Sequence, residues 1–150
     1  MPQSLANVLV HVIFSTKNRA PLILPDIEGE LYPYVASICR AHASPAHAIG
    51  GTENHLHIAC SLARTIAVSR LIEEIKRSSS KWIKTKGANY KAFAWQNGYG
   101  AFSIGQSQVG SLKGYIARQK EHHRVKTFEE EFREFLKRYQ IEYDDRYVWD

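Results

Sequence analysis

Four short segments combine hydrophobic residues in patterns that predict β-strands. Residues 8–15 are rich in Val, Ile and Phe and predict a first strand that is buried on at least one face. Residues 46–51 and 55–62 predict two more strands, joined by a short polar turn over 52–54. Residues 101–104 are short and alternate well enough to indicate a last strand.

Between these strands, hydrophobic positions recur at helical spacing. Asp26 is a candidate N-cap for a first helix, which Pro33 must either kink or delay. Residues 66–84 predict a second helix, and residues 106–123 predict a third, entered through Gly105. Thr127 and Glu130 then fit a capping box for a fourth helix. The apolar stripe of that fourth helix consists of Phe128, Phe132, Phe135, Leu136 and Tyr139.

The order of the first six elements is β-α-β-β-α-β, which predicts an α+β fold of the ferredoxin-like or RRM-like kind, an antiparallel sheet with helices on one face. With 150 residues, 44% of them hydrophobic, the chain can bury one substantial core. We therefore expect a single domain over 1–150, with a sheet core at 1–104, a helix at 105–126 and an acidic amphipathic helix and tail at 127–150. This architecture supports many functions, so the site has to decide the activity.

The net charge of +5 is unevenly distributed along the chain. Residues 127–150 carry four basic and eight acidic side chains, so the rest of the chain has 16 Lys and Arg against 7 Asp and Glu. A basic body favours a polyanionic partner through phosphate contacts and counterion release. Many basic domains bind no nucleic acid, however, so charge alone does not decide the question.

Two cysteines, Cys39 and Cys60, lie in apolar contexts and are too few for a disulfide framework, so we expect them to be reduced core residues. No apolar stretch approaches the roughly 20 residues that span a bilayer. The N-terminus also lacks the pattern of a secretory signal. We expect a soluble, cytoplasmic protein with no membrane partner.

Two short segments sixty residues apart can be interpreted as one site. His55 and His57 alternate with Leu56 on a predicted strand, so both imidazoles project from the same face. Tyr115 and Gln119 are four positions apart on a predicted helix and share a face. Taken singly, each feature has a simpler explanation: polar histidines on a wet strand face, an aromatic residue at the edge of the core and a solvated glutamine.

Four blocks in order resemble the single-tyrosine HUH transposases of small insertion sequences, where U is a bulky apolar residue. The resemblance begins in the strand-like run at 11–19, continues in 50–57 and in 115–123, and ends with the tail at 127–150. It implies that His55 and His57 are metal ligands, that Tyr115 is the nucleophile and that Gln119 is the third protein ligand. The family often has Pro-Asp before the histidine pair, where this chain has Glu53-Asn54.

The resemblance also implies the chemistry. Tyr115 would attack a phosphodiester in single-stranded DNA, forming a 5′-phosphotyrosine link and releasing a 3′-hydroxyl, and a second 3′-hydroxyl could reverse the step. The cofactor would be a divalent metal, Mg or Mn, bound with positions left open for the scissile phosphate. The partners would be hairpin ends of single-stranded DNA and a second subunit, in a homodimer that can exchange the tyrosine helix. Gly105 and Gly110 could supply the hinge for that exchange.

Basic residues near these motifs are candidates for contacting DNA: Lys17, Arg19, Arg77, Lys81 and Arg118. The usual explanation for such residues is a solvated helix or loop surface. Two further functions stay open from the sequence. One is a noncatalytic module that binds single-stranded nucleic acid, and the other is a domesticated HUH nickase that cuts without mobilising an element.

Overall fold

The alternation of side chains along the two central strands sends hydrophobic residues to one face of a sheet and histidines to the other. The computed structural model describes residues 2–150 and contains four strands, β1 (Val8–Ser15), β2 (Ala46–Thr52), β3 (His55–Leu62) and β4 (Gly100–Ile104). They form one antiparallel sheet in the order β2-β3-β1-β4. In the β1–β3 register, Ile13 lies opposite His57 and Ser15 lies opposite His55. The predicted fold class and strand positions are confirmed.

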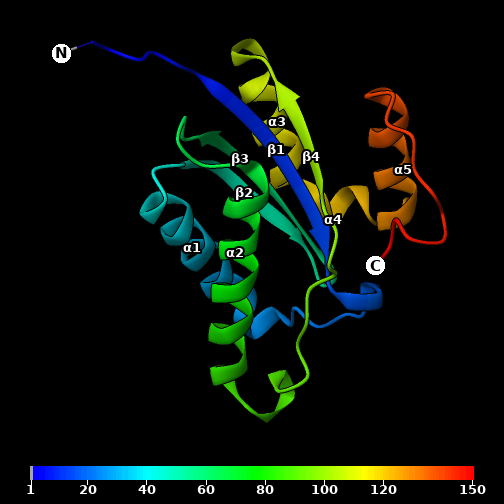
Figure 1. Ribbon diagram of the computed structural model, residues 1–150. Coiled ribbons are helices and arrows are strands. Elements are labelled where there is room, and N and C mark those ends of the chain that lie inside the picture. The colour runs from blue at the N-terminus through cyan, green and yellow to red at the C-terminus, as the bar shows by residue number, and fades with distance from the viewer. Residues whose placement is uncertain (1) are drawn as a thin grey trace.

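One face of the sheet is covered by α1 (Pro25–Ala41) and α2 (Val68–Ile83). Figure 1 shows both helices on the same side of the strands. Val12 and Phe14 of β1 and Ile58 of β3 point into this larger core, where each is at most 1% exposed. Most of the aromatic residues after α2 also belong to it, including Tyr90, Phe93 and Trp95. Burial of this apolar surface is the main term that holds the fold together.

The opposite face carries the histidines and is covered by the C-terminal third of the chain. The elements there are α3 (Val109–Ala117), α4 (Gln119–His122) and α5 (Phe128–Arg138). Short 3-10 turns occur at η1 (Lys17–Arg19), η2 (Lys84–Lys86), η3 (Ala88–Tyr90) and η4 (Gln106–Gln108). A second, smaller core forms where α5 meets the sheet, built from Ile13, Phe102, Phe128, Phe132, Phe135 and Leu136. The expected capping of α5 is confirmed, since the Thr127 hydroxyl accepts from the Glu130 backbone N–H.

The first helix begins two residues earlier than the sequence suggested. Leu24 is its N-cap and Pro25 its first residue, so Asp26 is not the cap but lies in the first turn. Proline suits this position because its ring fixes a helical φ and its missing N–H has no intrahelical partner there. The helix continues through Pro33, so a later start is excluded. Asp26 instead accepts a hydrogen bond from the Tyr90 hydroxyl at 2.5 Å.

Two further expectations concern the cysteines and membranes. Cys39 and Cys60 are both free and buried, as predicted. Within residues 2–150, no helix is both long and apolar enough to cross a membrane.

Candidate functional site

The two histidines of β3 lie on the sheet face that α5 covers, and both imidazoles are fully buried. His55 and His57 are each 0% exposed, and their ring centroids are 5.1 Å apart. Two residues apart on one strand, they project the same way, as the alternation of a strand requires. A histidine pair on a wet strand face is therefore not what this chain contains.

Each imidazole is oriented through its Nδ1 atom. His55 Nδ1 lies 2.8 Å from the Asn54 amide oxygen and 2.9 Å from the Thr52 hydroxyl. His57 Nδ1 lies 2.8 Å from Nε2 of His11, a β1 residue that is only 1% exposed. Partners on one ring nitrogen fix the ring and direct the other nitrogen, which is the usual arrangement behind metal-binding histidines. Both Nε2 atoms are thereby directed at the same space beneath α5.

Tyr115 and Gln119 reach this space from the other side, although they do not belong to one continuous helix. The predicted helix over 106–123 is divided, because Arg118 adopts φ −103° and ψ 22° between α3 and α4. The Tyr115 ring lies 5.8 Å from the His57 ring, centroid to centroid. Gln119 is 1% exposed, and its Oε1 lies 2.9 Å from His55 Nε2. The structure therefore brings together all four residues that the sequence singled out.

A glycine in β2 lets α3 approach the sheet closely. A Cβ atom at Gly50 would lie 2.6 Å from the backbone oxygen of Ile116, the residue after Tyr115. Only a residue without a side chain can occupy this position while α3 keeps its place. Gly50 thus helps set the distance between Tyr115 and the histidine pair. A Cβ atom at Gly114, the residue before Tyr115, would meet only the flexible Arg118 side chain.

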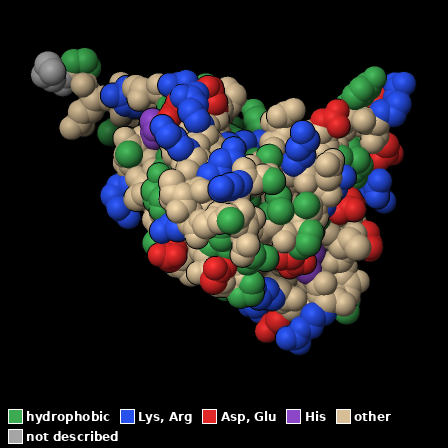
Figure 2. Space-filling model, turned by 90° about the horizontal axis from the view of Figure 1, so that it is seen from below, with side chains coloured by type: hydrophobic (Ala, Val, Ile, Leu, Met, Phe, Trp, Pro, Cys, Tyr) green, Lys and Arg blue, Asp and Glu red, His purple; other side chains and the backbone are tan. Residues whose placement is uncertain are grey.

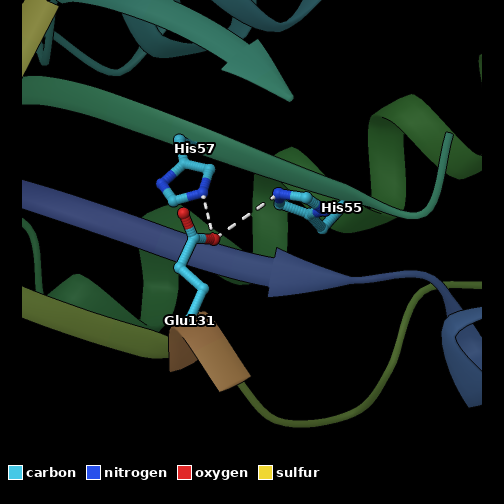
Figure 3. A group of neighbouring side chains, drawn as sticks. All are labelled: His55, His57 and Glu131. Atoms are coloured by element: carbon cyan, nitrogen blue, oxygen red, sulfur yellow. Dashed lines mark hydrogen bonds and ion pairs between the residues drawn. The ribbon is translucent and has the colours of Figure 1, made fainter. Parts of the chain in front are cut away.

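Glu131 of α5 lies at the centre of the site, and the sequence analysis did not find it. Its Oε1 is 3.0 Å from His57 Nε2 and 3.7 Å from His55 Nε2, as Figure 3 shows. Its Oε2 accepts hydrogen bonds from the Tyr115 hydroxyl and, at 3.2 Å, from the Gln119 amide. The carboxylate is 1% exposed. His55, His57 and Glu131 offer three ligand atoms within 4.8 Å of one another, a set that could hold a metal ion.

Burial controls the protonation of this cluster. It lowers the pKa of His55 to about 3, with the neighbouring His57 acting in the same direction, so His55 is neutral at pH 7 and its Nε2 can ligate. For Glu131, burial alone would raise the pKa, but hydrogen bonds from His123 and His57 outweigh it and keep the carboxyl ionised. Burial, followed by the bond to Glu131, raises the pKa of Tyr115 above its usual range.

The two histidines after α4 also contact the site. His123 Nε2 lies 3.1 Å from Gln119 Oε1 and 3.2 Å from Glu131 Oε1, and its ring is 4.5 Å from that of His55. The His122 ring stacks on Tyr115 at 4.6 Å. Both histidines are half-buried. His123 lines a groove of about 450 Å³ that opens to solvent beside His55 and that is also bordered by Arg19, Asn54 and Lys126.

The candidate DNA-contacting residues fall into two groups. Lys17 and Arg19 lie in η1 at the end of β1, where Arg19 borders the groove and donates to the Trp149 carbonyl at 3.0 Å. Arg118 is exposed between α3 and α4. Arg77 and Lys81 lie on α2, behind the sheet, and Arg77 pairs with Glu73 and Glu74. Arg19 therefore borders the same groove as His123, whereas Arg77 and Lys81 belong to a helix that covers the opposite face of the sheet.

The similarity to known proteins agrees with this geometry. The family described as "Transposase IS200 like" matches residues 4–119. Among curated proteins, none matches the sequence. Among solved structures, a candidate transposase from Deinococcus radiodurans R1 is similar with a TM-score of 0.61 and 14% identity, over 79% of this chain and 98% of that one. A REP-associated tyrosine transposase bound to a REP hairpin has a TM-score of 0.60 and 16% identity, over 82% of this chain and 72% of that one. At such identities the two structures show a shared fold, while the family match extends over most of the sequence, and the chain therefore belongs to the IS200-like transposases, enzymes of the single-tyrosine HUH class that cleave DNA.

Proposed function

We propose that this transposase cleaves and rejoins single-stranded DNA at the ends of an insertion sequence through a covalent 5′-phosphotyrosine intermediate. The observation that carries the proposal is the convergence of the Tyr115 hydroxyl and the Gln119 amide on one oxygen of Glu131, whose other oxygen faces both histidines. A nucleophile and a set of metal-ligating atoms therefore share one buried space. Such a combination suits phosphoryl transfer, which needs both attack on phosphorus and neutralised charge on its oxygens.

The donor set fits a divalent ion. His55 and His57 present Nε2 atoms whose rings are fixed through Nδ1, and Gln119 Oε1 lies 2.9 Å from His55 Nε2. We propose His55, His57 and Gln119 as ligands and Mg or Mn as the metal, because the amide oxygen suits these harder ions. The bound ion would offset charge on the scissile phosphate and favour loss of the phenol proton.

The remaining chemistry belongs to Tyr115. Its phenol oxygen forms the bond to phosphorus while the bond from phosphorus to the 3′ oxygen breaks. The proton that the phenol loses is balanced by the one that the departing 3′ oxygen gains, so a 3′-hydroxyl is released. The phosphotyrosine bond retains the energy of the cleaved linkage, and a second 3′-hydroxyl can therefore rejoin strands without ATP. A phenol with a raised pKa is a weak nucleophile, which is why cleavage should require the metal.

The proposed partner is a hairpin-bearing DNA strand. The REP-associated relative is bound to a hairpin, and we extend that kind of substrate to this chain. We propose that the cleaved strand approaches through the groove bordered by Arg19 and His123, and that Arg19, Lys17 and Arg118 contact its phosphates. Figure 2 shows Lys and Arg side chains gathered on one face of the molecule. A longer substrate could also reach Arg77 and Lys81 on α2. Because the substrate is cellular DNA, we place the protein in the cytoplasm of a bacterium or archaeon.

The cleavage site can be formed by one chain. Tyr115 approaches the His57 of its own chain, with 5.8 Å between ring centroids. We therefore propose that Tyr115 acts in cis on the histidine site, also within a homodimer. Exchange of the tyrosine helix about Gly105 or Gly110 is then not needed for chemistry.

The test is formation of a covalent adduct. The full-length protein is incubated with labelled single-stranded DNA that carries the flanks of its own gene, with Mn or with EDTA. We expect a denaturation-resistant adduct with Mn that is lost in EDTA and in Tyr115→Phe. Tight binding without an adduct would favour a noncatalytic module, for which Tyr115→Phe changes nothing. An adduct that is never passed to a second strand would favour a nickase.

A further inference from the structure

The two carboxylate oxygens of Glu131, a residue of α5, contact two different groups of side chains. Its Oε1 faces the histidines, at 3.0 Å from His57 Nε2 and 3.7 Å from His55 Nε2. Its Oε2 accepts the Tyr115 hydroxyl and the Gln119 amide. Figure 3 shows the side chain extending from α5 to lie between the two imidazoles. One carboxyl group thus links the ligating atoms to the proposed nucleophile.

The spacing of the four donor atoms resembles a coordination shell. Around an ion with metal–ligand distances of about 2.1 Å, neighbouring ligands in an octahedron lie about 3.0 Å apart. The distances from His57 Nε2 to Glu131 Oε1 and from His55 Nε2 to Gln119 Oε1 are 3.0 and 2.9 Å. Two imidazoles and an amide are neutral, whereas Mg and Mn prefer a site that contains an anionic oxygen. Glu131 supplies that oxygen.

We propose that Glu131 is a ligand of the metal and that its second oxygen positions the Tyr115 hydroxyl, so that α5 is an integral part of the catalytic centre. This inference rests on the function proposed above, because it concerns the same metal. It goes beyond the family match, which ends at residue 119, before α5 begins at Phe128. It also gives a role to Glu131, a buried charged side chain of α5.

Metal binding and the docking of α5 are coupled in this arrangement. The ion joins β3, which carries the histidines, to α5, which carries Glu131. Phe128 and Phe132 on either side of Glu131 are 2% and 3% exposed in the core beneath the helix. If the docked helix improves metal binding, the metal must stabilise docking by the same factor, because the two equilibria are linked. Mn should therefore slow hydrogen exchange in α5 even without DNA.

In a competing explanation, Glu131 binds where DNA would bind during the reaction. In that case the carboxylate occupies the place of the scissile phosphate and has to leave before cleavage. The two explanations predict different effects of removing the Glu131 carboxylate on metal affinity and on the rate of cleavage. A ligand contributes to metal affinity, so its loss weakens metal binding. A substitute competes with DNA, so its loss leaves metal binding unchanged and increases cleavage.

The experiment is calorimetric titration of the full-length, DNA-free protein with Mn. Two variants change the proposed ligand: Glu131→Gln, whose glutamine oxygen can still ligate, and Glu131→Ala, which has no ligating atom. Glu134→Gln, on the exposed side of α5, is the matched control. His57→Ala reports on the proposed site itself. Far-ultraviolet circular dichroism and urea unfolding confirm that each variant folds. Hydrogen exchange of α5 is measured with and without Mn.

We expect Mn affinity to fall at least tenfold in Glu131→Ala, to fall in Glu131→Gln and to stay unchanged in Glu134→Gln. Protection of α5 by Mn should disappear in Glu131→Ala and be reduced in Glu131→Gln. Wild-type affinity in the folded Glu131→Ala variant would overturn this inference alone, and faster cleavage in that variant would establish the competing explanation. Mn binding that is absent from the wild type, or unaffected by His57→Ala, would overturn the proposed metal site as well.

Discussion

The Tyr115 hydroxyl donates a hydrogen bond to Glu131, a residue of another helix 16 positions further along the chain. The same carboxylate lies 3.0 Å from His57 Nε2. The proposed nucleophile is therefore connected to the histidine pair through one side chain. Several properties of the enzyme should depend on how well this cluster is held in place.

His11 should act through His57, whose Nδ1 lies 2.8 Å from His11 Nε2. Substitution His11→Phe removes this partner but fits an environment that already contains Phe102 and Phe135. Loss of a group that orients a ligand typically costs 10–100-fold in metal affinity or activity, and we expect a loss of about that size. Mn titration measures it. Unchanged affinity in a folded His11→Phe variant would show that His57 needs no such support.

Gly50 should control the position of the tyrosine. A Cβ in Gly50→Ala would meet the Ile116 backbone oxygen at 2.6 Å, so α3 has to shift away from the sheet. A displacement of about 1 Å in a reacting group can cost roughly 100-fold in rate, so we expect slower cleavage with Mn binding largely retained. Gly29→Ala on the exposed side of α1, where no atom lies within 4 Å, is the control and should keep full activity. Equal rates for both variants would contradict this role of Gly50.

The stability of the metal-free protein should fall in acid. Burial lowers the pKa of His55 and of His11 to about 3, against about 6.5 in the unfolded chain. Between these two values the unfolded chain binds protons that the folded chain does not, so the free energy of unfolding decreases as the pH falls from about 6.5 toward 3. Each such histidine contributes a slope of roughly 1.4 kcal/mol per pH unit.

Urea unfolding in EDTA at pH 7.5, 6 and 5 measures this slope. His11→Phe should flatten it, because one of the two histidines whose pKa is lowered by burial is gone. His47→Gln, which changes an exposed histidine, should leave it as in the wild type. A free energy of unfolding that does not change over this range would show that the imidazoles are not protected as the structure indicates.

Active-site assembly within one chain predicts the behaviour of mixed subunits. His57→Ala removes a proposed ligand and Tyr115→Phe removes the proposed nucleophile. If Tyr115 acts on its own histidines, mixing the two inactive variants restores no cleavage, because each chain still lacks one part. Adduct formation by the mixture, compared with each variant alone, is the measurement. Restored activity would instead mean that tyrosine helices are exchanged between subunits.

Substitution of single lysines can distinguish DNA contacts at η1 from DNA contacts at α2. Lys17→Ala should weaken binding of single-stranded DNA and reduce the slope of log affinity against log salt by about one, as expected for one lost phosphate contact. Lys81→Ala changes a lysine of α2, on the far side of the sheet. Fluorescence anisotropy over a series of salt concentrations compares the two. An unchanged slope in Lys17→Ala would place the strand elsewhere.

Most of the fold could be predicted from the sequence because periodicity is a local property. The strands follow alternation, and α5 follows the capping residue Thr127 and an apolar stripe, all confirmed by the structure. The division of the tyrosine helix at Arg118 could not be predicted in this way. No glycine or proline marks that position, and the backbone change depends on how α3 and α4 pack against the sheet.

Only part of the site could be predicted, because short motifs, like periodicity, are local in the sequence. Short motifs revealed His55, His57, Tyr115 and Gln119, which the structure brings together. Glu131 belongs to no such motif, and its partners lie between 8 and 76 positions away in the sequence. One local signal did exist, since Glu131 lies three residues after Phe128 and four before Phe135, on the buried side of the α5 stripe. A charged residue at such a position is unusual and points to a buried partner.

The most direct test of the central claim is identification of the covalent bond. The adduct formed with Mn is digested with a protease and a nuclease, and the modified peptide is sequenced by mass spectrometry. We predict a nucleotide joined through its 5′-phosphate to Tyr115, together with a 3′-hydroxyl on the released strand. A nucleotide on another residue, or cleaved DNA with a free 5′-phosphate and no protein link at any time in the reaction, would contradict the account.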